Sequence, residues 1–196
     1  MSADVIDLLA GIAPGSALDT VRALRVQARD NAQNSYLSLF APEEPGDVSL
    51  RERFAVAAFV AALHGDTPAA PFYAGRLEAA DAAAIAAEVA AGATSGPYGA
   101  YPAGPLSVEN TPGLVFRVSA AGRAALGGKL AAALEHAHML VFHPRDSSDA
   151  ALQALLDAGW TTTGIVTLSQ LVAFLAFQIR VVAGLRVLAA VPAGAN

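Results

Sequence analysis

The stretch that decides the fold is residues 49–77, SLRERFAVAAFVAALHGDTPAAPFYAGRL. Its apolar residues are spaced i, i+3, i+4, i+7, which predicts an amphipathic helix over residues 51–63. His64 and Gly65 end this helix, and Asp66 or Thr67 can cap a second helix. The sequence therefore predicts a pair of helices joined by a short turn.

The composition predicts packed helices. Hydrophobic residues make up 55% of the 196 residues and aromatic residues 7%, so that Ala, Leu and Val dominate. Charged residues are only 15%. A monomer would have difficulty covering so much apolar surface, and we expect a homo-oligomer: a dimer, trimer or hexamer.

Charge and cysteine content exclude several classes of protein. The formal net charge is -5 and the basic residues are scattered, so we expect no nucleic-acid partner. The N-terminal segment is too acidic for a secretory signal, which favours a cytoplasmic protein. Without cysteine the chain forms no disulfide, thiolate metal site or redox thiol.

Residues 160–179, WTTTGIVTLSQLVAFLAFQI, are uncharged and about as long as a membrane span. Their many Thr, Ser and Gln side chains argue against a helix surrounded by lipid, and Arg180 follows directly. We therefore expect a buried core helix and no membrane partner.

The remaining pattern predicts an all-α chain in two helical halves, residues 1–91 and 119–196. A helix is expected from Ser16 to Phe40, and others over 78–91, 120–138 and 163–187, with a further one capped by residues 146–149.

Residues 92–118 form a Gly- and Pro-rich connection between the halves, in which 114–118 is the one candidate strand. Tyr98 and Tyr101 favour an arm packed on its own domain or on a neighbour. The alternative is a disordered linker.

The helix pair at 50–77 resembles the carboxymuconolactone decarboxylase and alkylhydroperoxidase-like superfamily, especially its peroxidase-related members. Leu50, Arg53 and Leu77 match the family pattern. In the second half, Gly159 and Ile165 fit the ends of a turn motif, and Arg180 fits the last position of a separate helix motif. The resemblance implies an alkylhydroperoxidase-like fold built from two helical halves and assembled as a trimer or hexamer.

When the family pattern is aligned with this sequence, its CxxC motif is missing. The two cysteine positions hold Asp66 and Ala69, the histidine position holds Tyr73, and the upstream glutamate position holds Phe54. A carboxylate has no reversible oxidation cycle with peroxide. Thiol peroxidase activity is therefore expected to be absent.

Asp66, Tyr73 and His64 are the candidate catalytic residues if acid/base chemistry remains. Asp66 and Tyr73 lie seven residues apart, which permits an acid/base pair. The alternative is that Asp66 caps a helix, Tyr73 fills the space of the family histidine, and His64 interacts with a helix C-terminus.

A polar arc on the predicted helix over 163–187 supplies the candidate ligand-binding residues. It includes Thr167, Gln170 and Gln178, which either line a ligand cavity or form a hydrogen-bonded subunit interface. Arg180 follows, and either pairs with a carboxylate such as Glu52 or binds a small acidic ligand.

Three histidines, His136, His138 and His143, look like a metal cluster at first sight. Residues two apart on a helix point to nearly opposite faces, and no Glu has the spacing of a zinc protease motif. We therefore expect a structural or surface role for them, no metal site and no cofactor.

Two functions follow as hypotheses. The first is a non-redox member of the family that acts as a ligand-binding or structural homo-oligomer. The alternative is a cofactor-free decarboxylase-like enzyme for lactones or small acids, using the acid/base residues.

Overall fold

The computed structural model describes residues 4–65 and 67–190, and over these residues the protein is all-α, 70% helical and without strands. The α-helices are α1 Val5–Ala10, α2 Ala17–Ala23, α3 Val26–Phe40, α4 Leu50–Leu63, α5 Ala69–Ala74, α6 Ala79–Gly92, α7 Ala120–Leu126, α8 Gly128–Phe142, α9 Asp149–Asp157 and α10 Thr162–Ala190. Two short 3₁₀ turns, η1 Pro105–Glu109 and η2 Pro144–Asp146, complete the list.

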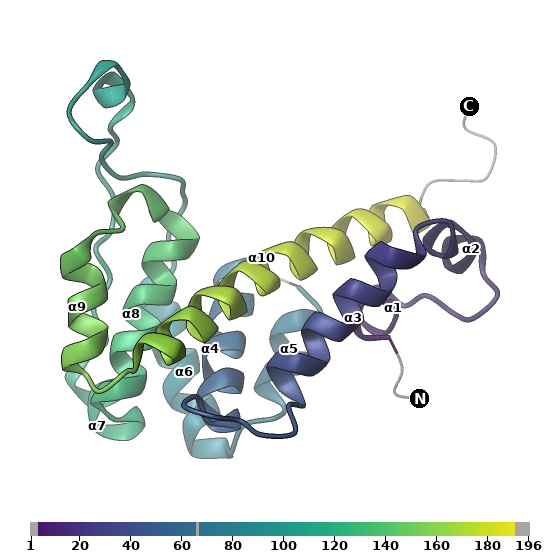
Figure 1. Ribbon diagram of the computed structural model, residues 1–196, viewed down its shortest axis with the longest axis horizontal. Coiled ribbons are helices and arrows are strands. Elements are labelled where there is room, and N and C mark those ends of the chain that lie inside the picture. Colours follow the sequence, from purple (N-terminus) through teal and green to yellow (C-terminus); the bar gives the residue numbers. More distant parts are fainter. Residues whose placement is uncertain (1–3, 66, 191–196) are drawn as a thin grey trace.

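The two predicted halves share one hydrophobic core. Helix α10 crosses the molecule, with α8 and α9 beside its first turns and α1, α2 and α3 beside its last (Figure 1). Helix α4 lies at the centre and packs against α5, α6, α8 and α10. The helices of residues 119–196 therefore cover those of residues 1–91 directly.

The predicted helix over 51–63 is confirmed as α4, which begins one residue earlier. Ser49 caps it: its side chain accepts a hydrogen bond from the amide of Glu52, whose carboxylate accepts one from the amide of Ser49. Most of the helix is buried on all sides, from Ala55 to Ala61. Small side chains let α5 and α6 approach it closely.

Two predicted helices are each divided into two. The expected helix from Ser16 to Phe40 breaks at Arg25, whose φ of -122° and ψ of 58° are not helical. The bend lets Arg22 and Arg29 pair with acidic residues of α1 and α2. The expected helix over 120–138 breaks at Gly127, whose φ of 87° favours glycine.

Helix α10 is long and apolar enough to cross a membrane by length and composition, with a mean hydropathy of 1.9 in its best window. Within that window 39% of the residues are buried. The helix packs against α1, α3, α4 and α8, and the rest of that window is not buried, so the expected buried core helix is found only in part. The absence of a membrane partner stays a prediction.

Residues 93–118 form a folded arm, whose tip, residues 101–110, rises beyond the helices (Figure 1). The arm contains no strand. One antiparallel bridge joins Gly99 and Thr111 across its two limbs, with hydrogen bonds of 2.8 and 3.1 Å. At its base the arm packs on its own domain, as one of the two alternatives predicts: the Tyr98 ring stacks on His143 at 5.0 Å.

An ion pair between α4 and α6 gives the fold a pH-dependent element. The Arg51 guanidinium donates to both carboxylate oxygens of Asp81, at 2.6 and 2.7 Å, and these hydrogen bonds hold the pKa of Asp81 below its usual value. Because the folded-state pKa is lowered, the stabilisation is present above the ordinary pKa of an aspartate. It is lost as the pH falls through the folded-state value.

We expect Asp81→Asn to lower the free energy of unfolding at pH 7 by about 0.5–1 kcal/mol, since Arg51 is half exposed. The difference from the parent should shrink below about pH 4. Urea unfolding at both pH values measures this. The control is Asp30→Asn at an exposed position. A deficit that persists unchanged at low pH would argue against the ion pair as its source.

Candidate functional site

The predicted catalytic Tyr73 is a core residue. Its side chain is completely buried, and its hydroxyl donates a hydrogen bond of 2.7 Å to Oε1 of Gln178, which is also completely buried. The ring packs against Phe40 at 4.9 Å and Phe72 at 5.1 Å. Burial raises the pKa of Tyr73 far above its usual value, so the phenol stays protonated and has no access to a substrate in this conformation.

The neighbouring positions of the predicted site are also packed. Ala69 is buried, and the half-buried Phe54 ring lies 5.3 Å from that of Phe40. His64, at the end of α4, has Nδ1 within 2.8 Å of the carbonyl oxygen of Val60. Asp66 lies outside the described residues. The described part of the predicted site thus fills space between helices.

The predicted ligand-binding residues on α10 do not gather in one cavity. Gln170 is exposed, and the Thr167 hydroxyl donates to the carbonyl of Thr163 at 3.1 Å. Gln178, on the same arc, is buried because α10 there runs beside α3 and α5. The neighbours of α10 change along its length. Residues on the same side of the helix are therefore exposed near its start and buried further along.

The prediction that Arg180 pairs with Glu52 is wrong. The exposed Arg180 donates to the carbonyl oxygen of Ala176 at 2.8 Å. The Glu52 carboxylate is held by Lys129, whose ammonium lies at 2.8 Å. The capping hydrogen bond with Ser49 directs the Glu52 side chain toward the start of α4. At that point Lys129 of α8 pairs with it.

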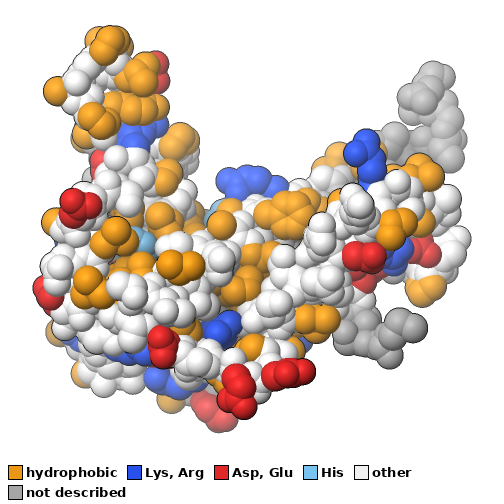
Figure 2. Space-filling model, in the orientation of Figure 1, with side chains coloured by type: hydrophobic (Ala, Val, Ile, Leu, Met, Phe, Trp, Pro, Cys, Tyr) orange, Lys and Arg blue, Asp and Glu red, His pale blue; other side chains and the backbone are white. Residues whose placement is uncertain are grey.

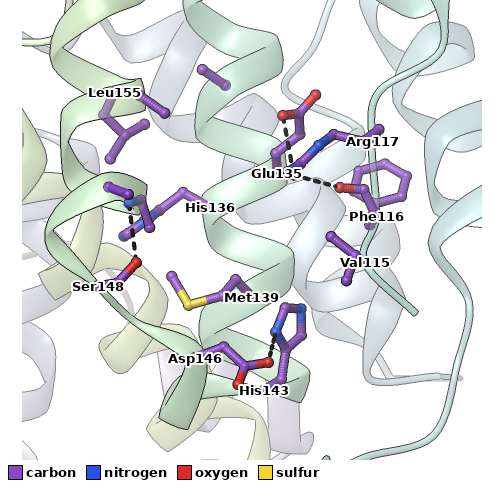
Figure 3. A pocket seen from close by; sticks show the side chains of 14 residues that line it. Val115, Phe116, Arg117, Glu135, His136, Met139, His143, Asp146, Ser148 and Leu155 are labelled. Atoms are coloured by element: carbon purple, nitrogen blue, oxygen red, sulfur yellow. Dashed lines mark hydrogen bonds and ion pairs between the residues drawn. The ribbon is translucent and has the colours of Figure 1, made fainter. Parts of the chain in front are cut away.

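A cavity of about 460 Å³ lies elsewhere, between α8, α9 and the returning limb of the arm (Figure 3). Its walls are mostly apolar, with a few polar groups at separate points. It is lined by Val115, Phe116, Arg117, Ala132, Glu135, His136, Met139, His143, Asp146, Ser148, Ala150, Ala151, Ala154 and Leu155. Most ligand sites have this kind of lining.

His136 is the unusual group in this cavity. Its side chain points from α8 toward α9 and the Ser148 turn (Figure 3), and only 5% of the residue is exposed. Its Nδ1 has no hydrogen-bond partner among the described residues. Burial lowers the pKa of His136, so the ring is neutral at pH 7. A buried polar atom without a partner normally costs about 1–3 kcal/mol.

The charged groups around the cavity are already compensated. Glu135 accepts a hydrogen bond of 2.7 Å from Arg123, and Nη1 of Arg117 lies 3.6 Å from its second oxygen. The Asp146 carboxylate lies 3.0 Å from Nδ1 of His143 and accepts the amide of Ala100 at 2.8 Å. The cavity therefore offers hydrogen-bonding groups and little uncompensated charge.

The three histidines of α8 and its end have separate surroundings. The Nε2 atom of His138 lies 2.9 Å from the carbonyl oxygen of Gly92, and its ring stacks on Phe116 at 4.9 Å. His136 faces the cavity instead. Within the described ranges, no three His, Asp or Glu residues could jointly hold a metal ion. The structural role expected of these histidines fits His138, whereas the cavity beside His136 was not predicted from the sequence.

A second cavity, of about 280 Å³, lies between α4, α5 and α6. Ala58, Ala62, Ala70, Ile85 and similar apolar residues line it, and no polar side chain does. Such a surface has no group with which to orient a polar ligand. The cavity beside His136 is the stronger candidate site.

Comparisons with known proteins give no match: no family model, curated protein or solved structure is similar to this chain. The resemblance to the carboxymuconolactone decarboxylase superfamily stays a prediction that rests on its sequence motifs.

Proposed function

We propose that the protein is a non-redox homo-oligomer that binds an uncharged, amphipathic small molecule in the cavity between α8, α9 and residues 115–117. The observation that carries the proposal is His136, which lines the cavity and whose buried Nδ1 has no hydrogen-bond partner among the described residues. A ligand hydroxyl or carbonyl group would supply the missing hydrogen bond. Its apolar part would contact side chains such as Met139 and Leu155.

The polar groups of the cavity favour an uncharged ligand. A neutral imidazole gives no charge attraction to a carboxylate, and the cation in the lining, Arg117, already lies 3.6 Å from the Glu135 carboxylate. A cation would have to compete with the arginines that hold Glu135. A hydroxyl group both donates and accepts, so it suits either tautomer of His136.

The non-redox part of the proposal rests on the absence of cysteine and on Tyr73. No thiol exists to attack a peroxide, and the position that the family pattern gives to histidine is filled by a buried phenol with its own partner. Tyr73 thus acts as a packing residue. This supports the ligand-binding proposal over the decarboxylase-like alternative, which requires an accessible acid/base group.

The homo-oligomer part rests on exposed apolar residues. Val187 and Leu188 on α10 are more than half exposed, as are Leu24 and Val26 near the start of α3. Together with the high apolar content, such surfaces indicate contacts with other chains.

We expect benzyl alcohol to bind saturably, and benzoate and benzylamine, which are matched in size, to bind at least tenfold more weakly. His136→Leu keeps the volume of the side chain and removes the hydrogen bond, so it should weaken benzyl alcohol binding about tenfold. Isothermal titration calorimetry measures the dissociation constants.

The matched control is Gln170→Leu, which makes a similar change at an exposed position of α10 outside the cavity lining. It should leave benzyl alcohol binding unchanged. Equal affinity for the parent and for His136→Leu would contradict the proposed site. A preference for benzoate would contradict the proposed ligand class.

A further inference from the structure

The arm tip, residues 101–110, is an apolar projection that rises beyond the α-helices in Figure 1. Leu106 and Val108 are 52% and 89% exposed, and hydrophobic side chains cover much of the tip in Figure 2. Its one charged residue is Glu109, which is exposed. An exposed apolar turn held away from its own core is typical of a surface that contacts another molecule.

The arm is held in a fixed position. The Gly99–Thr111 bridge joins its limbs, and the Tyr98 hydroxyl donates to the carbonyl of Leu114 at 2.7 Å. Arg145 lies 4.2 Å from the centre of the Tyr101 ring and donates to the carbonyl of Glu109 at 3.3 Å. Because the arm is already ordered, docking it would cost little conformational entropy.

A complementary surface lies at the other end of the molecule. The groove on the last turns of α10, which we call the α10 groove, has a volume of about 350 Å³ and is lined by Thr67, Pro68, Ile179, Ala183, Arg186, Val187 and Ala190. Val187 is 67% exposed. Arg186 lines the groove and forms no ion pair with any carboxylate in the described part of the chain.

We propose that the arm tip of one copy docks in the α10 groove of a second copy, and that a two-fold axis makes this contact twice. Leu106 and Val108 would enter the apolar groove, and Glu109 would pair with Arg186. The arm tip and the end of α10 lie at opposite ends of the molecule and on the same side of it (Figure 1). One chain cannot join its own two surfaces, whereas a copy rotated by 180° brings both pairs together.

This inference rests on the proposed homo-oligomer and is independent of the proposed ligand. It commits the assembly to a closed dimer, because two identical contacts use both surfaces of both chains. The opposite charges of Glu109 and Arg186 fix the direction in which the arm lies in the groove.

Charge reversal tests the contact. Glu109→Arg and Arg186→Glu each place like charges together at both contacts, and each alone should raise the dimer dissociation constant on the order of a hundredfold. In an equimolar mixture of the two variants, the mixed dimer has opposite charges at both contacts. Sedimentation velocity should therefore show monomers for each variant alone and dimers for the mixture.

Val108→Glu is the second test, since it places a charge in the apolar groove at a position that is 89% exposed in the free chain. It should give a folded monomer by circular dichroism and light scattering. The control is Val166→Glu, at an exposed position on the first turns of α10, which should remain dimeric.

The outcomes separate the two proposals. A parent chain that is still monomeric at a concentration on the order of 100 micromolar would overturn both the homo-oligomer and the arm contact. A parent oligomer that is unchanged by these variants, or a mixture that fails to dimerise, would overturn the arm contact alone.

Discussion

Tyr73→Ala is expected to lower the free energy of unfolding by about 4 kcal/mol, as is typical when a buried aromatic side chain is truncated. The ring is completely buried between Phe40, Phe72 and α10, so its removal leaves a cavity in the centre of the core. The change also leaves Oε1 of Gln178 without its donor. Urea or guanidinium unfolding measures the effect.

Tyr73→Phe separates the ring from the hydroxyl. It keeps the packing and removes the 2.7 Å hydrogen bond to Gln178, so the expected loss is about 1–2 kcal/mol. If Tyr73 were instead an accessible catalytic residue, both variants would leave stability nearly unchanged. That result would contradict the assignment of Tyr73 to the core.

Arg53→Met is expected to destabilise the protein by about 3 kcal/mol, because it leaves several buried carbonyl groups without a donor. The Arg53 guanidinium donates to the carbonyl oxygens of Leu39, Pro45 and Val48, at 2.8, 2.8 and 2.9 Å. These bonds tie the end of α3 and the following loop to α4. Burial lowers the pKa of Arg53, in keeping with a cation held by neutral dipoles.

The control is Arg51→Met, two residues earlier on the same helix. Arg51 is half exposed and makes one ion pair, with Asp81, so its loss should be about 0.5–1 kcal/mol. Equal effects of the two substitutions on the midpoint of urea unfolding would show that the carbonyl contacts of Arg53 do not stabilise the loop.

The helical pattern of the sequence predicted much of the fold. Apolar spacing and the turn at 64–65 were sufficient for α4, and the Gly- and Pro-rich composition marked the arm. The division at Arg25 was missed because it lies within a continuous helical pattern. The division at Gly127 was missed although the sequence has two consecutive glycines there. At Arg25, ion pairs made by Arg22 and Arg29 outweigh local helix propensity. At Gly127, the low helix propensity of glycine and its positive φ favour the break.

The candidate site was harder to predict than the fold. Aligning the family motif with the sequence makes Tyr73 a candidate site residue. The burial of Tyr73, however, depends on α10, which follows more than a hundred residues later in the chain. The cavity beside His136 is formed by α8, α9 and residues 115–117, which share no local pattern. The one available signal was a histidine on the apolar face of α8, and such a residue is usually a satisfied core histidine.

The most direct test of the proposed site is the ¹⁵N NMR signal of the His136 imidazole during a titration with benzyl alcohol, assigned with His136→Leu. The proposal predicts that the nitrogen shifts of His136 change and saturate with the calorimetric dissociation constant, while those of His64, outside the cavity, stay constant. Unchanged His136 shifts at saturating benzyl alcohol would contradict it.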